Sequence, residues 1–277
     1  MKQLIINADD FGLCESVNQG IIECLQYGIV TDLSFMINLD EFNSSSGLLK
    51  KIGKTSVGFH LNLTLGKSIL GARSNLANEY GDYFDFKTLI KKIILMEIRP
   101  DDITCEIKSQ IDFLLKNGFS ISHVDSHRNI HLLPNIMKPL KKIMKEYALN
   151  KYIRMPSEGM RCILKFKKQN MIRGCIFKLI STYYSVLTNH NYKVKTVGSD
   201  FFNNPQSSKA FYSTIQSIKK SPHSIFEIPV HPGYPSSILL KHDKYSSQRK
   251  WELDFLKSKI DVEVGGKKIY LSSFDDI

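Results

Sequence analysis

The chain has 277 residues, of which 42% are hydrophobic and 23% are charged, as is ordinary for a globular protein that buries a large core. No Pro/Gly/Ser-rich linker, low-complexity tract or internal repeat interrupts it, which excludes a solenoid and favours one domain of barrel size over two small ones. The five cysteines include no Cys-x-x-Cys pair, which argues against a thiolate zinc site and against a disulfide framework.

The net charge of +11 is concentrated in one block. Residues 128–199 carry 15 Lys and Arg side chains and two acids, Glu146 and Glu158. Such a block attracts the phosphate groups of nucleic acid, of an anionic membrane or of a pyrophosphate-linked substrate. Its part around 159–199 is predicted to be a basic amphipathic insertion that contacts a membrane. A helix that packs its apolar face on the protein and keeps its lysines in water is the open alternative.

The order of the predicted elements is that of βα units. Short apolar runs predict strands at 3–7, 31–38, 56–63, 121–125, 152–155, 194–197, 224–230 and 268–272. Helix-like segments separate them at 15–27, 40–52, 86–96, 101–117, 134–147, 161–188, 207–219 and 246–258. This alternation favours an α/β fold with a mostly parallel sheet, and eight strands is the number that a barrel requires.

Polar groups follow several of these strands. Asp9 and Asp10 come after the first, His60 lies near the end of the third, His127 follows the fourth, and His231 follows the strand at 224–230. Because active sites of parallel barrels gather at the carboxyl ends of the strands, we expect these side chains to share one site. Successive strand residues point to opposite faces, so the backbone must bend at the Asp pair to bring both carboxylates to that site.

Each motif has a structural alternative when it is taken alone. An Asp-Asp pair is often a helix cap or a solvated turn, and an isolated histidine among apolar neighbours, such as His60, is often a core residue. The segment 123–131 is stronger, because three imidazoles and a carboxylate within nine residues suit a metal site. Its alternative is a polar turn between a strand and a helix.

Four motifs together resemble a known family. Asn-Ala-Asp-Asp-Phe-Gly at 7–12, Gly-x-His-Leu-Asn-Leu-Thr at 58–64, Asp-Ser-His-x-x-x-His-x-x-Pro at 125–134 and His-Pro-Gly-Tyr at 231–234 occur in the order seen in YdjC/ChbG-like carbohydrate deacetylases. The resemblance implies a distorted, TIM-barrel-like (β/α) barrel forming a single domain over 1–277. It also implies an enzyme that uses one divalent cation to remove the N-acetyl group from an N-acetylhexosamine-containing glycan, releasing acetate.

The resemblance implies roles for individual residues. It assigns His60 and His127 to the metal together with one aspartate of the 9–10 pair. By analogy with the Asp-Asp pair of other polysaccharide deacetylases, Asp10 is assigned to the metal and Asp9 to proton transfer as the base, with the reverse split left open. His231 is expected across the site, as the acid that protonates the leaving sugar nitrogen or as an electrostatic partner. The residues expected to contact substrate are Arg154, which could instead orient Asp9, and Asn62, Asp125 and His131.

One position departs from the family pattern. Asn129 stands where a further histidine of the central segment is usual, and we expect Asn129 to tune substrate contacts while His127 keeps the metal. Two imidazoles and a carboxylate suit Zn²⁺ and also accept Mg²⁺, Mn²⁺ or Co²⁺.

Other functions and the partners stay open at this point. The rival functions are another metal-dependent barrel hydrolase, such as a phosphoesterase or amidohydrolase, and a catalytically silent barrel that binds glycan or nucleic acid. We expect an N-acetylated sugar as substrate, free or lipid-linked, and no nucleic-acid partner, because no recognition motif is present. A homodimer is compatible with the sequence. The N-terminus resembles no signal peptide, so we expect a cytoplasmic protein, with peripheral contact at the inner face of the membrane as a hypothesis.

Overall fold

The computed structural model describes residues 2–156, 171, 175–176, 178–184, 193–198, 207–243, 246–258, 263–264 and 267–277. Their contacts group into two compact units that alternate along the chain. Unit 1 comprises residues 1–9, 16–33 and 154–277, and unit 2 comprises residues 10–15 and 34–153. The chain leaves unit 1 after Asp9 and returns to it at Ser16, so the first segment of unit 2 is short and runs from Asp10 to Glu15.

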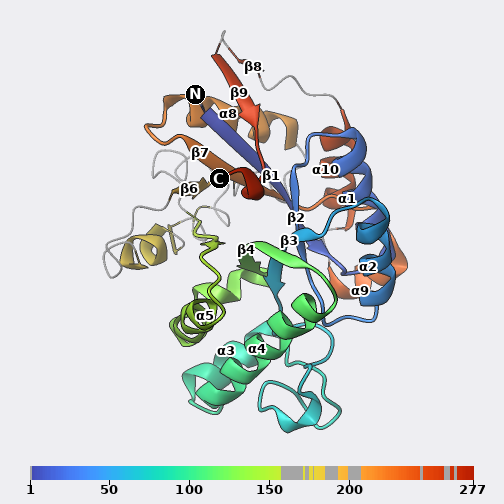
Figure 1. The fold of residues 1–277 in the computed structure, drawn as a ribbon, viewed down its shortest axis with the longest axis vertical. Helices are drawn as coiled ribbons and strands as arrows, with labels where there is room; N and C mark the ends of the chain where they lie inside the picture. The colour runs from blue at the N-terminus through green and yellow to red at the C-terminus, as the bar shows by residue number, and fades with distance from the viewer. Residues whose placement is uncertain are drawn as a thin grey trace. The chain divides into compact units, whose positions relative to one another are not determined.

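Unit 2 is built on parallel strands with the order β5-β4-β3-β2, of which Figure 1 labels β2, β3 and β4. The strands are β2 (Asp32–Phe35), whose first two residues belong to unit 1, β3 (Ser56–Leu61), β4 (Ser120–Ser126) and β5 (Tyr152–Ile153). The helices are α2 (Phe42–Lys51), α3 (Phe86–Ile94), α4 (Pro100–Lys116) and α5 (Pro134–Glu146), with 3-10 helices η1 (Gly71–Arg73) and η2 (His127–Leu132).

Unit 1 is organised around β1 (Lys2–Phe11), whose last two residues belong to unit 2. This strand pairs in parallel with β7 (Ile225–Val230) and with β9 (Lys267–Leu271), while β6 (Val194–Thr196) pairs with β7. A short strand, β8 (Glu263–Val264), runs antiparallel to β9. The helices are α1 (Glu15–Tyr27), α8 (Ser207–Lys220), α9 (Ser237–His242) and α10 (Ser246–Lys257), with 3-10 helix η3 (Phe274–Asp276).

The cores of both units explain why these strands form. Leu4, Ile5 and Ile6 of β1 are fully buried, as expected for a strand of a parallel sheet that is covered on both faces. In unit 2, the Phe35 ring stacks on Phe42 and meets Phe11 edge-on, with centroid distances of 5.4 and 5.3 Å. This packing fixes the chain immediately after Asp10.

The predicted α/β fold with a parallel sheet is confirmed, and the eight predicted strands correspond to β1–β7 and β9. Several elements differ from expectation: β1 continues through Asp9 and Asp10 to Phe11, and β8, α9 and the 3-10 helices η1, η2 and η3 were not predicted. Most of the helix predicted at 161–188, and of the basic insertion around 159–199, lies outside the described residues. Among the residues that are described, no helix has both the length and the apolar character needed to cross a membrane.

Candidate active site

The end of β1 has the bend that the Asp pair requires. Asp10 adopts a left-handed backbone conformation with φ of 69°, and Gly12 follows with φ of 93°. Aspartate is one of the few residues with a side chain that tolerate this region. At Gly12 a Cβ atom would lie 2.3 Å from the carbonyl oxygen of Met36, so the turn has no room for a side chain. The strand therefore ends in a turn that glycine makes possible.

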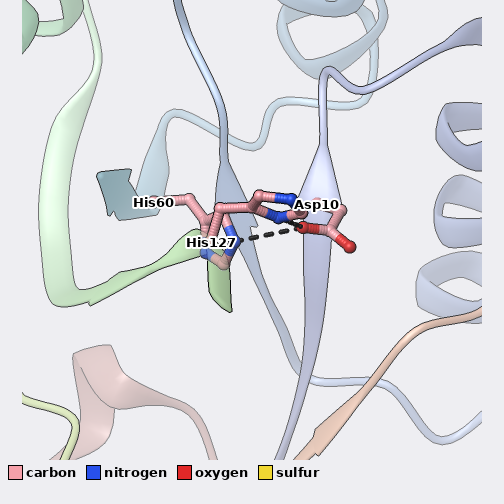
Figure 2. Close-up of side chains that lie close together, drawn as sticks. All are labelled: Asp10, His60 and His127. Atoms are coloured by element: carbon pink, nitrogen blue, oxygen red, sulfur yellow. Dashed lines mark hydrogen bonds and ion pairs between the residues drawn. The ribbon is translucent and has the colours of Figure 1, made fainter. Parts of the chain in front are cut away.

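Asp10 lies at the centre of a cluster with two histidines (Figure 2). Its Oδ1 atom is 3.1 Å from Nε2 of His60, on β3, and 2.8 Å from Nδ1 of His127, at the start of η2. One ligand atom from each of the three side chains lies within 4.8 Å of the others. Asp10 and His60 are buried and His127 is half-buried. Two imidazole nitrogens and a carboxylate oxygen are a donor set that fits a divalent metal with positions left for water.

His60 is held on both sides by carboxylates. Its Nδ1 lies 2.7 Å from Oδ1 of Asp125, opposite the Nε2 that faces Asp10. Burial alone would lower the pKa of His60, but the charges and hydrogen bonds of Asp125 and Asp10 raise it to about 10. The hydrogen bond from Nδ1 to Asp125 leaves Nε2 as the nitrogen that can bind a metal, an arrangement common for histidine ligands.

The segment after β4 places His127 by an unusual backbone path. Arg128 and Asn129 both have positive φ, 58° and 56°, inside η2. Asn129, at the position where the family pattern has histidine, is half-buried. His131 is fully buried, and its Nδ1 lies 2.5 Å from Oγ of Ser126. His127 is the imidazole of this segment that the structure brings to Asp10.

A second cluster, in unit 1, surrounds Asp9. Arg154 donates hydrogen bonds from Nη1 and Nη2 to the two carboxylate oxygens of Asp9, at 2.5 and 2.8 Å. Its Nε also donates to Glu227 at 2.7 Å, and Thr196 donates to the other oxygen of Glu227 at the same distance. Arg154 is 2% exposed, so one buried guanidinium is shared between two buried carboxylates. Two roles were predicted for Arg154, contact with substrate and orientation of Asp9. In the structure Arg154 contacts Asp9.

Glu227 has a strongly perturbed acidity. Complete burial raises its pKa from 4.5 to about 7, against the opposing effects of Arg154 and Thr196. Perturbed carboxyl groups of this kind concentrate at functional sites, although ion-pair networks produce them as well. Glu227 lies on β7, four residues before His231.

His231 approaches Asp9 from the loop after β7. Its Nε2 lies 3.7 Å from Oδ2 of Asp9, and its backbone N–H donates to the buried Glu252 of α10 at 2.6 Å. The loop packs closely against α1, because a Cβ atom on Gly20 would lie 2.9 Å from Cα of Gly233. Gly233 of the His-Pro-Gly motif thus allows the loop to pack closely on α1, and this packing positions His231.

The remaining predicted residues lie in unit 2. Asn62 is buried and donates to the carbonyl oxygen of Leu65 at 2.7 Å, while its backbone contacts Gln110. Asp125 is fully buried against His60. The substrate contacts predicted for Asn62, Asp125 and His131 stay predictions.

Four residues of these clusters were not singled out in the sequence: Ser34, Thr196, Glu227 and Glu252. Ser34 donates to Asp125 at 2.8 Å, and the two glutamates contact Arg154 and His231 as described. A signal existed for Glu227, a charged residue within the apolar run 225–230, because acids are rarely buried without a partner. Ser34 carries no comparable signal.

Comparison with known proteins finds relatives that match nearly the whole chain. The chain is 26% identical over 276 residues to a carbohydrate deacetylase of Clostridium beijerinckii, covering 99% of this chain and 100% of the relative. It is 28% identical over 258 residues to a carbohydrate deacetylase of Halalkalibacterium halodurans, covering 92% and 94%.

A crystal structure of a protein from Enterococcus faecalis V583, whose description proposes cellobiose-phosphate cleavage, superposes with a TM-score of 0.77. It covers 99% of this chain and 98% of its own, and at 22% identity it supports the fold alone. The family model described as YdjC-like protein matches residues 3–260. The chain therefore belongs to the YdjC-like protein family.

Proposed function

We propose that this chain is a metal-dependent carbohydrate deacetylase, which hydrolyses the N-acetyl group of an N-acetylhexosamine-containing glycan and releases acetate. The observation that carries the proposal is the cluster of Asp10, His60 and His127 around one carboxylate oxygen. Membership of the family and the names of the two relatives supply the substrate class.

The three residues of the cluster would hold one divalent ion, Zn²⁺ or Mg²⁺ in the first instance, with Mn²⁺ and Co²⁺ as alternatives. A bound ion of this kind supplies Lewis acidity for the acetyl carbonyl and for water. Asp125 would act on this centre through His60, whose ring it orients.

Asp9 and His231 are proposed as the proton-transfer pair. Asp9 would accept a proton from the attacking water, and His231 would donate one to the sugar nitrogen as the C–N bond breaks. Arg154 supports this role because its two hydrogen bonds fix both oxygens of Asp9. Asp9 and Asp10 are consecutive residues, so the proposed base and the proposed metal ligand are joined by one peptide bond.

The finer identity of the substrate is a proposal based on the charge of the chain. The excess of cations at 128–199 favours a sugar on a lipid or pyrophosphate carrier, with a soluble oligosaccharide as the alternative. A single domain, a cytoplasmic location, contact with an anionic membrane and a homodimer stay predictions.

The test is acetate release by the purified protein from a panel of soluble and lipid-linked N-acetylhexosamine substrates. We expect release that stops on chelation and returns with the divalent ion. The substrate processed fastest distinguishes the soluble from the carrier-linked class. Metal binding without acetate release from any substrate would contradict the deacetylase proposal and favour another metal-dependent hydrolase. A protein that binds no divalent ion would favour the silent binding barrel.

A further inference from the structure

A continuous chain of hydrogen bonds runs away from the metal cluster through the interior of unit 2. Asp125 joins His60 to Ser34, with distances of 2.7 Å from Oδ1 to Nδ1 of His60 and 2.8 Å from Oδ2 to Oγ of Ser34. Oγ of Ser34 lies 3.0 Å from Nε2 of His123, whose Nδ1 lies 2.9 Å from Oγ of Ser122. All five side chains are buried, and none exceeds 3% exposure.

The direction of donation along this chain follows from the groups present. An ionised Asp125 can only accept, so Ser34 and His60 both donate to it. Ser34 has one proton, which goes to Asp125, and its oxygen must therefore accept from Nε2–H of His123. With one ring proton, on Nε2, His123 then accepts at Nδ1 from Ser122. This order of donors places a proton on Nδ1 of His60 and leaves its Nε2 directed to Asp10.

The backbone is shaped to hold His123 in this position. A Cβ atom on Gly58 would lie 2.4 Å from both Cε1 and Nε2 of His123, and 2.7 Å from Oγ of Ser34. The space that glycine leaves on β3 is thus occupied by the imidazole from β4.

The pairing of β3 with β4 also contains an extra residue at this level. Val57 is opposite Ile121, but Phe59 is opposite Val124. This shift puts Asp125 opposite His60. Regular pairing continued from Val57 would have put Val124 there, because each step along one strand matches one step along the other.

We propose that Ser34 and His123 are positioning residues of the metal centre, which act through Asp125 to hold the His60 ring in the orientation that binds the ion. This inference rests on the proposed function, since it assumes the metal cluster of Asp10, His60 and His127. His123 therefore belongs to the support of the centre rather than to the ligands, although it stands in the histidine-rich segment that predicted the metal site.

The test measures metal affinity rather than turnover. Co²⁺ or Zn²⁺ is titrated into chelator-treated protein in competition with a chromophoric chelator, for wild type and for Ser34→Ala and His123→Phe. Outer residues of metal sites typically contribute about 10- to 100-fold to affinity, and we expect a loss near the lower end of that range for each variant. Gly58→Ala should weaken binding as well, because its Cβ displaces His123 without removing a hydrogen-bonding group.

Ser45→Ala is the matched control. Ser45 is a fully buried serine on α2 of the same unit and is not one of the five side chains of the hydrogen-bonded chain described above. We expect its substitution to leave the dissociation constant of the metal within about two-fold of wild type. Equal losses in the Ser45 and Ser34 variants would overturn the proposal, because they would reflect general loosening of the unit.

A double-mutant cycle decides whether Ser34 acts through Asp125. In an Asp125→Asn background the carboxylate that Ser34 orients is absent, so Ser34→Ala should cause little further loss of affinity. Fully additive losses would overturn the proposed route. In the metal-free protein, the ¹H–¹⁵N signal of His60 Nδ1 should shift in Ser34→Ala and stay unchanged in Ser45→Ala.

The outcomes separate this inference from the proposed function. Metal binding that depends on Ser34, in a protein that releases no acetate, would reject the deacetylase and retain the positioning role. Acetate release together with equal metal affinities in wild type, Ser34→Ala and His123→Phe would retain the deacetylase and reject the positioning role. A wild-type protein that binds no divalent ion would reject both.

Discussion

Asp9 and Asp10 are chemically identical side chains with different neighbours, and we propose different tasks for them. Asp9 receives two hydrogen bonds from Arg154, whereas Asp10 faces the imidazoles of His60 and His127. A guanidinium fits both oxygens of a carboxylate with two parallel N–H groups, while two imidazoles with nearby nitrogens favour a metal. The surroundings therefore support Asp10 as the metal ligand and Asp9 as the base.

Substitution of Asp9 separates these tasks. In Asp9→Asn the side chain keeps its shape but loses the basic oxygen, so we expect turnover to fall by about 10²- to 10⁴-fold while bound metal is retained. His60→Ala, in contrast, should lose metal and turnover together. Metal content by elemental analysis and acetate release measure the two effects, and near-normal turnover in Asp9→Asn would reject the assignment of the base.

Glu227 gives the stability of the protein a definite pH dependence. Its pKa is raised from 4.5 to about 7 in the folded state, so between these values the folded protein binds a proton that the unfolded chain has released. The contribution of this group to the free energy of unfolding is therefore largest below about pH 4.5 and decreases as the pH rises to about 7.

Glu227→Gln should remove this pH dependence. Between about pH 4.5 and 7 the free energy of unfolding should then decrease less steeply than in wild type, by at most about 1.4 kcal/mol per pH unit. Denaturant unfolding at a series of pH values measures it. Thr196→Val serves as the comparison: it removes a hydrogen bond that lowers the pKa of Glu227, so the decline should extend to higher pH. Identical slopes in wild type and Glu227→Gln would contradict the assignment.

The site residues that the sequence revealed are those within compact motifs. Asp10, His60 and His127 each stand at a predicted strand end, and the structure brings them together. Ser34 lies 91 positions from Asp125, and a serine within an apolar strand is compatible with many surroundings. Its role depends on the register between strands, which one sequence does not disclose.

Among the elements, β1 provides both aspartates of the candidate site. The strand was predicted over 3–7 but continues to Phe11: Asn7 and Ala8 pair with Pro229 and Val230 of β7, and the carbonyl oxygen of Phe11 accepts from the N–H of Met36. Acids at a strand's end lower its apparent strand propensity, and these backbone interactions override that local preference.

Gly12→Ala tests the turn. A side chain there would be strained by the φ of 93° and would collide with the carbonyl oxygen of Met36, so we expect a loss of stability above about 2 kcal/mol and weaker metal binding. Gly53→Ala is the control, since φ is 71° but no atom lies within 4 Å of its added Cβ. Its cost should be about 1 kcal/mol, with metal binding unchanged. Equal costs in denaturant unfolding would show that the collision with Met36 contributes nothing.

Two helices carry cysteines of opposite character. Burial raises the pKa of Cys24, on α1, to about 12, whereas Cys105, on α4, is exposed. Alkylation depends on the thiolate and on access, so Cys105 should react in the native protein and Cys24 after unfolding. Peptide mapping after timed alkylation checks this order, and early modification of Cys24 would contradict it.

Helices with a clear apolar period were predicted to within two residues at each end in most cases. Thus α1 spans Glu15–Tyr27, as expected, and α8 spans Ser207–Lys220 against a prediction of 207–219. Short elements were missed. The six residues of α9 and the two residues of β8 are too few to display a period, and they form through tertiary contacts.

For the whole molecule, the proposed metal site at Asp10, His60 and His127 predicts a link between cation binding and stability. An ion that binds the folded protein raises its stability by about 2.7 kcal/mol at a free concentration 100 times its dissociation constant. Chelation should therefore lower the melting temperature of wild type, and excess ion should restore it. In His60→Ala the ion should cause no shift, and a shift equal to that of wild type would place the binding elsewhere.

The α/β class could be predicted from the alternation of strands and helices in the sequence. The division of the residue contacts into two units could not. The sequence contains no linker, yet its contacts form two units whose segments alternate along the chain. Segments distant in sequence therefore complete each unit, as when β9, at the C-terminal end, pairs with β1. Local composition carries no information about such pairing.

The extra residue in β4 has a consequence for inheritance. Loss of the codon for Ser122 or His123 would restore even pairing with β3 and would keep Asp125 opposite His60, but it would remove one member of the hydrogen-bonded chain behind Asp125. The motifs that contain Asp10, His60 and His127 would all remain in the gene, while Asp125 would lose part of its support. A relative with that deletion is therefore expected to bind a divalent ion more weakly, and a metal titration of that relative would measure the loss.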